Sequence, residues 1–248
     1  MLWRLSAMSK YAWLCMLFLP WVVAAQDAED ILRRADRTRV PAQSFVWDIT
    51  VTTYEGNRPP STRGFEVYMQ GTEKSLVKFV APPRYLGQSV LYLNRDLWIY
   101  LPEAGKPVRV PLAQRLVGQV ANGDLARTNY AGDYLPTLVG RDQVNGLETY
   151  VLSLTAKTKE VTYAAIKYWV TTETFLPVKA EFYAGTGTLL KTGSFDAYTE
   201  LAGHLRLTRL TFVDAVRKDM QSTMDFSNLR VRALPDRYFD KQSMKTLD

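Results

Sequence analysis

The sequence is poor in the residues that most often bind metals or act as nucleophiles, because its 248 residues include one cysteine and one histidine. The cysteine, Cys15, lies in an N-terminal apolar segment that we expect to be removed and is not expected to carry a lipid. This inventory excludes the usual zinc clusters, cysteine nucleophiles and c-type haem attachment. A Ser-His-Asp triad would need His204, and no G-x-S-x-G motif accompanies it. We interpret His204, which follows Gly203, as an ordinary residue at the start of a strand.

No hydrophobic run is long enough for a typical membrane span. The apolar segment Tyr11–Val23 falls short of the roughly 20 residues that a spanning helix needs, which disfavours a retained anchor. Arg4 and Lys10 precede it, and the small residues Val23-Ala24-Ala25 follow. This order is typical of a secretory signal peptide. We predict that residues 1–25 are the signal peptide and that the mature protein, one domain over residues 26–248, begins near Gln26.

The charge excess is mild, and it is not concentrated in one region. The chain carries a net charge of +6, and its basic residues are interleaved with acids. A nucleic-acid interface would need clustered Lys and Arg, so we predict no nucleic-acid partner. Asp124 and Asp133 each follow a glycine and resemble helix-capping and turn residues rather than the paired carboxylates of a glycosidase. We predict no enzymatic activity, no cofactor and no metal site.

The spacing of apolar residues changes from helical to strand-like near residue 44. Asp27–Thr38 has apolar residues at helical spacing, with acids before bases, and predicts a helix. Apolar and polar residues then alternate along a first strand from Ser44. Further strands are predicted at 65–70, 75–81, 88–93, 97–101, 147–154, 166–172, 178–183, 189–198, 205–213 and 220–226. Leu234-Pro235-Asp236 indicates a last helix. We predict a mainly β (α+β) fold: a curled antiparallel sheet of about 10–11 strands forming an incomplete β-barrel with a helical lid.

Two predicted strands, Gln88–Leu93 and Leu97–Leu101, are apolar on both faces, so both faces must be covered. Such a sheet could line a pocket for an apolar ligand. The candidate lipid-binding residues are Phe45, Trp47, Ile49, Phe65, Val67, Leu91, Leu93 and Trp98. An ordinary aromatic core is the alternative, and either face of Val90–Leu93 could point inward.

A long segment, Pro111–Pro136, interrupts the strands and has no strand-like period. Antiparallel neighbours need only short turns, so a segment of this length is expected to cover or line a binding site. Its apolar residues Leu112, Leu116, Val117 and Val120 are candidate lid residues that would compete with a ligand for the same cavity.

Three segments stand out: FVAPPRYLGQSVLYLNRDLWIYLPEAGKPVRVP at Phe79–Pro111, NGDLARTNYAGDY at Asn122–Tyr134 and LPDRYFDKQSM at Leu234–Met244. They resemble the outer-membrane lipoprotein-sorting family, the periplasmic carriers related to LolA and LolB, and especially a LolA-like branch associated with lipid exporters. The resemblance spans most of the mature chain, and the second segment is the most specific.

The resemblance implies a periplasmic carrier that holds the acyl chains of lipoproteins or lipids in an apolar half-barrel and transfers them towards the outer membrane. It implies an inner-membrane lipid exporter and an outer-membrane acceptor as partners. Family carriers latch the lid with an arginine, for which Arg109, Arg115 and Arg127 are candidates here. The alternative is a periplasmic lipid sensor or an accessory subunit of a lipid exporter or envelope-stress system, and a hydrolase without a recognisable motif is a third hypothesis.

Overall fold

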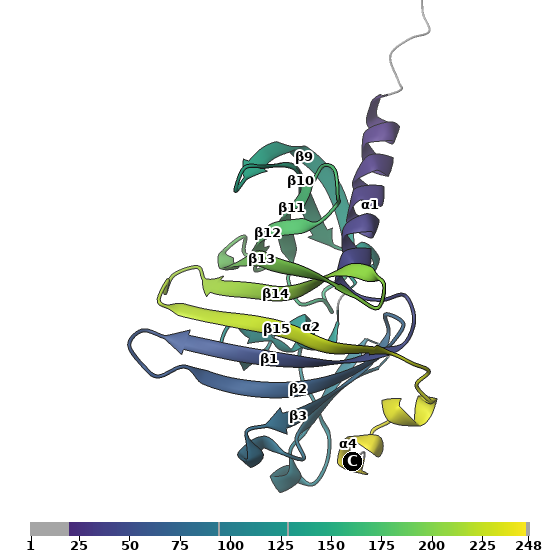
Figure 1. Ribbon diagram of the computed structural model, residues 1–248, viewed down its shortest axis with the longest axis vertical. Coiled ribbons are helices and arrows are strands. Elements are labelled where there is room, and N and C mark those ends of the chain that lie inside the picture. The colour runs from purple at the N-terminus through teal and green to yellow at the C-terminus, as the bar shows by residue number, and fades with distance from the viewer. Residues whose placement is uncertain (1–19, 94, 128, 247–248) are drawn as a thin grey trace, which may run out of the picture.

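The computed structural model describes residues 20–93, 95–127 and 129–246, and most of the predicted signal peptide lies outside this part. Within it, thirteen strands form one antiparallel sheet that curls without closing (Figure 1). The spatial order is β6-β5-β4-β3-β2-β1-β15-β14-β13-β12-β11-β10-β9. The described residues include no helix that is both long and apolar enough to cross a bilayer.

The first half of the large sheet contains β1 (Phe45–Glu55), β2 (Ser61–Gln70), β3 (Lys74–Ala81), β4 (Ser89–Leu93), β5 (Asp96–Tyr100) and β6 (Val108–Arg109). The second half contains β9 (Tyr134–Val144), β10 (Leu147–Ala156), β11 (Ala165–Thr171), β12 (Pro177–Tyr183), β13 (Leu189–Leu201), β14 (His204–Asp214) and β15 (Met220–Val231). Each strand pairs with its neighbour in the chain, and β15 returns to pair with β1 in the middle. The first and last strands of the chain therefore join the two halves.

The connection between β6 and β9 runs from one edge of the sheet to the other. We call residues 110–133 the crossover. It contains a small hairpin of β7 (Arg115–Val117) and β8 (Val120–Ala121), followed by α2 (Asn122–Ala126) and α3 (Tyr130–Asp133). The predicted long segment is thus the single chain passage between two distant edges, which explains its length.

The predicted N-terminal helix is confirmed and is longer than expected, because α1 runs over Pro20–Arg39. Ala28, Ile31, Leu32 and Ala35 are fully or almost fully buried at helical spacing. They pack into the same cluster as the crossover and the strands. Arg206 on β14 donates to the carbonyl oxygens of residues 37 and 40 at the end of α1, the second at 2.8 Å. These donations satisfy backbone acceptors that a helix end leaves free.

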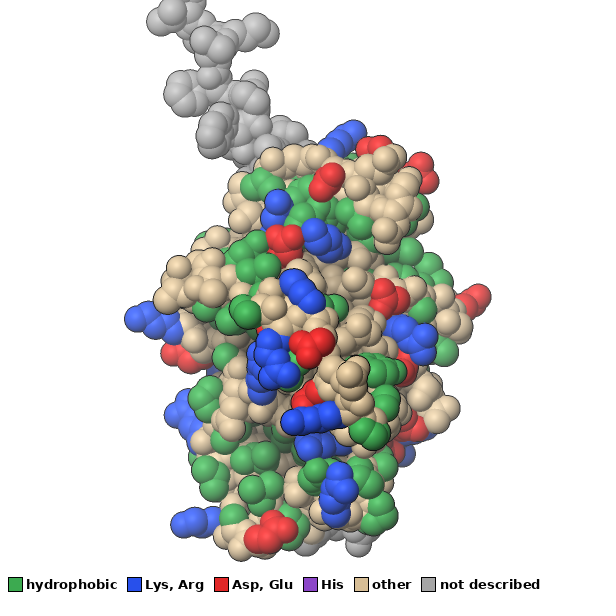
Figure 2. Space-filling view, turned by 90° about the vertical axis from the view of Figure 1, so that its left-hand side faces the viewer, with side chains coloured by type: hydrophobic (Ala, Val, Ile, Leu, Met, Phe, Trp, Pro, Cys, Tyr) green, Lys and Arg blue, Asp and Glu red, His purple; other side chains and the backbone are tan. Residues whose placement is uncertain are grey.

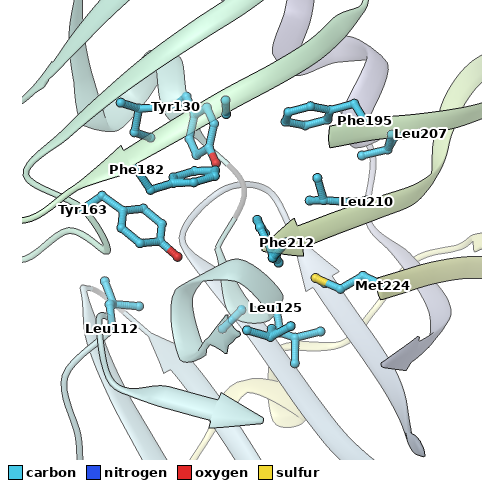
Figure 3. Packing of buried hydrophobic residues seen from close by; sticks show 14 of the residues in the cluster. Leu112, Leu125, Tyr130, Tyr163, Phe182, Phe195, Leu207, Leu210, Phe212 and Met224 are labelled. Carbon is cyan, nitrogen blue, oxygen red and sulfur yellow. The ribbon is translucent and has the colours of Figure 1, made fainter. Parts of the chain in front are cut away.

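The sheet has two packed faces. We call the face that contacts α1 and the crossover the inner face, and the opposite one the outer face. The inner cluster joins both halves of the sheet, and Figure 3 shows part of it between α2 and β12–β15. A smaller outer cluster lies over β1–β4 beneath the C-terminal segment, which contains η3 (Asp236–Phe239) and α4 (Ser243–Thr246). Two further 3₁₀ turns, η1 (Pro83–Tyr85) and η2 (Pro102–Ala104), follow β3 and β5.

The predicted fold class is confirmed, although the large sheet has more strands than the ten or eleven expected. The unpredicted strand β9 overlaps the end of the predicted lid segment at Tyr134. It contains Pro136 and a bulge near Gly140, and most of its residues are exposed. Edge strands tolerate such features, whereas the alternation that identifies half-buried strands is absent. The two-residue β6 is too short to show a period.

Candidate functional site

The structure divides the eight candidate lipid-binding residues between the two faces. The inner cluster contains Phe45, Trp47, Ile49, Phe65 and Val67, all buried. The outer cluster contains Leu91, with Leu93 and Trp98 packed against it. Val90 and Tyr92 belong to the inner cluster, so the open question about β4 is answered: its even-numbered residues point inward.

The outer face of β4 and β5 is covered by the C-terminal segment, which explains why these strands are apolar on both sides. Phe239 and Met244 are buried in the outer cluster with Leu91. The Lys241 ammonium lies 3.3 Å from the centre of the Trp98 ring. Leu91, Leu93 and Trp98 therefore hold the C-terminal segment and do not share a surface with the five inner residues.

The inner face is aromatic and closely packed. The Phe65 and Phe79 rings lie 4.8 Å apart, and the Trp47 ring lies 4.8 Å from that of Phe226. Such ring pairs stabilise a core beyond the area that they bury. The Trp47 indole N–H is buried without a hydrogen-bond acceptor among the described residues. This face is therefore a mainly apolar surface that also contains buried polar atoms.

The candidate lid residues occupy that surface. Leu112, Val117 and Val120 are buried in the inner cluster, and Leu116 is half-buried against it. The crossover and the inner strands therefore bury each other's apolar side chains. The structure brings the lid residues together with the five inner candidates.

The tip of the β7–β8 hairpin fits closely against the centre of the sheet. Gly118 adopts φ +53°, and a Cβ there would overlap the hydroxyl oxygens of Ser222 on β15 and Thr53 on β1. The Gln119 backbone N–H donates to Ser222 Oγ at 2.9 Å. Both the positive φ and the close approach favour glycine at this position.

A buried ion pair ties the crossover to β13. The Lys191 ammonium lies 2.6 Å from Asp124 Oδ2 on α2 and donates to the Gln119 carbonyl oxygen at 2.7 Å. The two side chains are 4% and 5% exposed. The same ammonium lies 3.4 Å from the centre of the Phe212 ring. Lys191 thus contacts two points of the crossover from inside the sheet.

Asp124 has two hydrogen-bond donors besides the Lys191 ammonium, and they define its role. It accepts from the Ala121 N–H at 2.8 Å, which caps α2, and from the Tyr163 hydroxyl at 2.9 Å. Burial lowers the pKa of Lys191, while the nearby Asp124 carboxylate opposes this shift. Burial and the Asp124 charge raise the pKa of Tyr163. The capping role predicted for Asp124 is confirmed, and the structure adds its pairing with Lys191.

Of the three candidate latch arginines, Arg127 is the buried one. Its guanidinium binds Asp133 in a bidentate pair and contacts the Tyr92 hydroxyl. It also donates to the Thr72 carbonyl oxygen at 3.0 Å and to Glu73 at 3.3 Å. These contacts link both crossover helices to β4 and to the β2–β3 turn.

Arg109 and Arg115 are placed differently. Arg109 pairs with Asp96 at the edge of the sheet and is 62% exposed. Arg115 pairs with Asp214 at 3.0 Å and is 55% exposed. Both guanidinium groups are exposed to water, which weakens each pair.

A further polar contact joins the crossover to α1. The Ala131 N–H donates to Asp36 Oδ2 at 2.7 Å, and Arg39 lies 3.8 Å from the other carboxylate oxygen. The Arg39 guanidinium lies 4.2 Å from the centre of the Tyr130 ring. Burial raises the pKa of Asp36 from the usual 3.8 to about 6, although Arg39 opposes the shift.

An open cleft of about 620 Å³ lies where the β9–β10 turn, the β11–β12 turn and β13 meet. None of the predicted lining or lid residues borders it. Phe195 and Tyr198 on its wall also contact the inner cluster. Among the described residues no group of His, Cys, Asp or Glu could hold a metal ion. His204 is exposed and begins β14, as predicted.

The sequence offered no signal for Lys191. It follows Leu189 and Leu190 in an ordinary strand, and its partner Asp124 lies 67 residues earlier in the chain. Neither Ser222 nor Thr53 was recognisable as a contact for the crossover, because strand hydroxyls commonly face water. Only the fold places these groups under the crossover.

These features define a class of protein: a curled, open antiparallel sheet whose apolar inner face is occupied by a crossover held by buried polar contacts. The chain is 38% identical to a LolA superfamily protein from Nitrosomonas europaea, with a TM-score of 0.83 over 87% of this chain and 98% of that one. A family model with the description "-like: Uncharacterized protein" matches residues 71–246. Comparison with curated proteins finds no match. The chain belongs to the LolA superfamily.

Two more distant structures share the fold. A DUF1329 family protein from Desulfovibrio piger is 24% identical, with a TM-score of 0.78 over 89% of this chain and 99% of that one. A putative outer membrane lipoprotein-sorting protein domain from Vibrio parahaemolyticus is 21% identical, with a TM-score of 0.78 over 90% of this chain and 100% of that one. Both structures therefore show the same fold as this chain over nearly its whole length.

Proposed function

We propose that the protein is a periplasmic carrier that binds the acyl chains of lipoproteins or lipids on its inner face and transfers them towards the outer membrane. The proposal includes removal of the signal peptide, an inner-membrane lipid exporter as donor and an outer-membrane acceptor. The observation that carries it is the packing of the inner face, where crossover side chains cover an apolar surface shared by both sheet halves.

The energetics suit a carrier that must release its cargo. Each buried methylene contributes about 0.8 kcal/mol, so a long acyl chain contributes roughly 10 kcal/mol before other costs. Displacing Leu112, Val117 and Val120 from the inner cluster would offset much of this gain. The net affinity is then moderate, because the crossover and the acyl chain compete for one surface.

The first test is direct identification of the cargo. Protein purified from the periplasm is extracted with organic solvent, and the extract is analysed by mass spectrometry. We expect acylated molecules in stoichiometric amount. Extracts that contain no more lipid than those of an unrelated periplasmic protein would contradict the proposal.

A matched pair of variants tests the binding face. Val67 and Val46 are both fully buried, Val67 in the inner cluster and Val46 in the outer one. Val→Thr keeps the side-chain shape and buries a hydroxyl, which costs about 1–3 kcal/mol where it has no partner. Val67→Thr should weaken binding of a fluorescent fatty acid about tenfold, and Val46→Thr should leave it unchanged. Equal effects in variants with native circular dichroism would exclude the inner face as the site.

A further inference from the structure

Several turns gather at one end of the strands. The β1–β2 turn contacts the β14–β15 turn, since the Gly56 N–H donates to the Asp219 carbonyl oxygen at 3.0 Å. Arg115 of the crossover reaches Asp214 at the start of the second turn. Arg63 on β2 donates to Tyr85 in η1 at 2.9 Å. We call this surface, made of residues 54–63, 83–86, 115 and 214–220, the hairpin rim.

The hairpin rim carries an excess of positive charge. It contains six bases, Arg58, Arg63, Arg84, Arg115, Arg217 and Lys218, and three acids, Glu55, Asp214 and Asp219. Each acid is paired with one base. Within the described chain, Arg63, Arg84 and Lys218 have no acidic partner. The β5–β6 turn next to η1 adds no net charge, because it contains one acid, Glu103, and one base, Lys106.

Apolar side chains project between these bases. Val216 is 85% exposed, the highest fraction among the large hydrophobic residues described, and Arg217 and Lys218 follow it directly. Leu86 after η1 and Tyr54 at the end of β1 are also exposed. Figure 2, which views the molecule from the left-hand side of Figure 1, shows Lys and Arg side chains interspersed with hydrophobic and acidic ones on this face.

We propose that the hairpin rim docks on an anionic lipid bilayer, with basic side chains at the head groups and the Val216 turn at the interface. Basic residues near an anionic leaflet gain electrostatic energy, and an aliphatic tip beside them adds apolar contact. The rim is built from projecting turns rather than a groove, which suits a planar surface better than an extended peptide. This interaction does not depend on cargo binding.

The hairpin rim lies next to the crossover, so docking would bring the crossover close to the bilayer. Arg63 donates to the Leu116 carbonyl oxygen at 3.5 Å, and Arg115 begins β7. The β7–β8 hairpin therefore lies directly behind the rim. A molecule leaving the inner face past this hairpin would emerge at the bilayer.

Vesicle sedimentation tests the proposal. Vesicles of phosphatidylcholine alone and of phosphatidylcholine mixed with phosphatidylglycerol are incubated with the mature protein. We expect binding to the mixed vesicles that weakens with added salt, and much weaker binding to the neutral ones. Arg84→Gln/Lys218→Gln should lower partition to mixed vesicles about 30-fold, at roughly one factor of five per charge. Val216→Ser should lower it severalfold.

The control removes the same charge at the other end of the strands. Arg37 near the end of α1 and Arg237 in η3 are exposed, and Arg37→Gln/Arg237→Gln should leave vesicle binding within about twofold of the wild type. Equal losses in the two double variants, equal binding to both vesicle types, or binding to neither would overturn the proposal. Fatty-acid binding measured on the same samples shows separately whether the carrier function is retained.

Discussion

At the scale of single residues, the contact between Lys191 and Asp124 joins the sheet to the crossover inside the core. Both charges are buried, and each has a second hydrogen-bonding partner. A buried pair of this kind gives little net stability compared with apolar residues, but removing one partner leaves an uncompensated charge. The pair therefore favours a unique docked position for α2.

We expect Asp124→Ala to lower the free energy of unfolding by roughly 3–5 kcal/mol, because Lys191 would be left buried without its carboxylate partner. Lys191→Met/Asp124→Ala should recover part of this loss, since no buried charge remains. Urea denaturation followed by circular dichroism measures both. A double variant as unstable as Asp124→Ala would indicate that the lost α2 cap, rather than the charge, dominates.

The chain provides a control with the same geometry at the surface. Arg209 and Asp225 also lie 2.6 Å apart, but their side chains are 54% and 36% exposed. Asp225→Ala should cost less than about 1 kcal/mol. Similar losses for the two aspartates would mean that burial does not determine the effect.

Asp36 gives the stability a specific dependence on pH. Its pKa is raised by burial from 3.8 to about 6, so between these values the folded protein keeps a proton that the unfolded chain has lost. The raised pKa stabilises the fold at low pH, and this contribution is lost as the pH rises through about 6. Two pKa units correspond to roughly 3 kcal/mol.

The side chain introduced by Asp36→Asn cannot titrate. The contributions of the other carboxyl groups to the pH dependence therefore cancel in the difference between the two free energies of unfolding. The free energy of unfolding of the wild type minus that of Asp36→Asn should fall by roughly 3 kcal/mol from below pH 3.8 to above pH 6. Urea denaturation at a series of pH values measures this difference. A difference that rises with pH would show that Arg39 overcomes the burial of Asp36.

At the scale of elements, the sequence predicted the strands that have one buried face, but it did not predict the exposed edge strand β9 or which segment covers β4. The alternation of Phe45, Trp47 and Ile49 identified β1, and similar patterns located most other strands. β9 was missed because Pro136 and its exposed residues remove the alternation. The second apolar face of β4 indicated a cover, but the sequence could not distinguish the crossover from the C-terminal segment, since either is apolar enough.

The crossover should loosen when its hairpin tip can no longer approach the sheet. Gly118→Ala introduces strain at φ +53° and overlaps with Ser222 and Thr53. We expect a loss of roughly 2–4 kcal/mol in the free energy of unfolding and faster hydrogen exchange in residues 110–133. If the crossover competes with cargo, the same variant should bind a fluorescent fatty acid more tightly.

Gly71 provides the matched control. It has φ +60° in the β2–β3 turn, and a Cβ there would meet nothing within 4 Å. Gly71→Ala should cost only the strain, about 1–2 kcal/mol, and should leave crossover exchange unchanged. Faster exchange in both variants would point to general destabilisation rather than to release of the crossover.

At the scale of the whole molecule, the class of fold followed from the strand patterns and the lack of strand–helix alternation. The order of the strands in the sheet did not follow, because it depends on the pairing of β1 with β15, which are separated by most of the chain. That pairing makes the β6–β9 connection run from edge to edge. Only with this pairing do Asp124 and Lys191 meet, so the sequence could not predict their contact. The alternation along single strands, in contrast, was enough to place five of the candidate lining residues on one buried face.

The final prediction concerns the N-terminus of the mature molecule. The expected cleavage between Ala25 and Gln26 falls within α1. The four buried inner residues of this helix, Ala28, Ile31, Leu32 and Ala35, all follow the cleavage site. Removing the first 25 residues therefore leaves the docked part of α1 and the carbonyl groups that accept from Arg206.

We expect protein from the periplasm to begin at Gln26 by intact mass, and to unfold in one cooperative step. A form beginning at Val40 should lose several kcal/mol, because four inner side chains are removed. An intact mass that retains the first 25 residues, or a lipid on Cys15, would contradict this assignment.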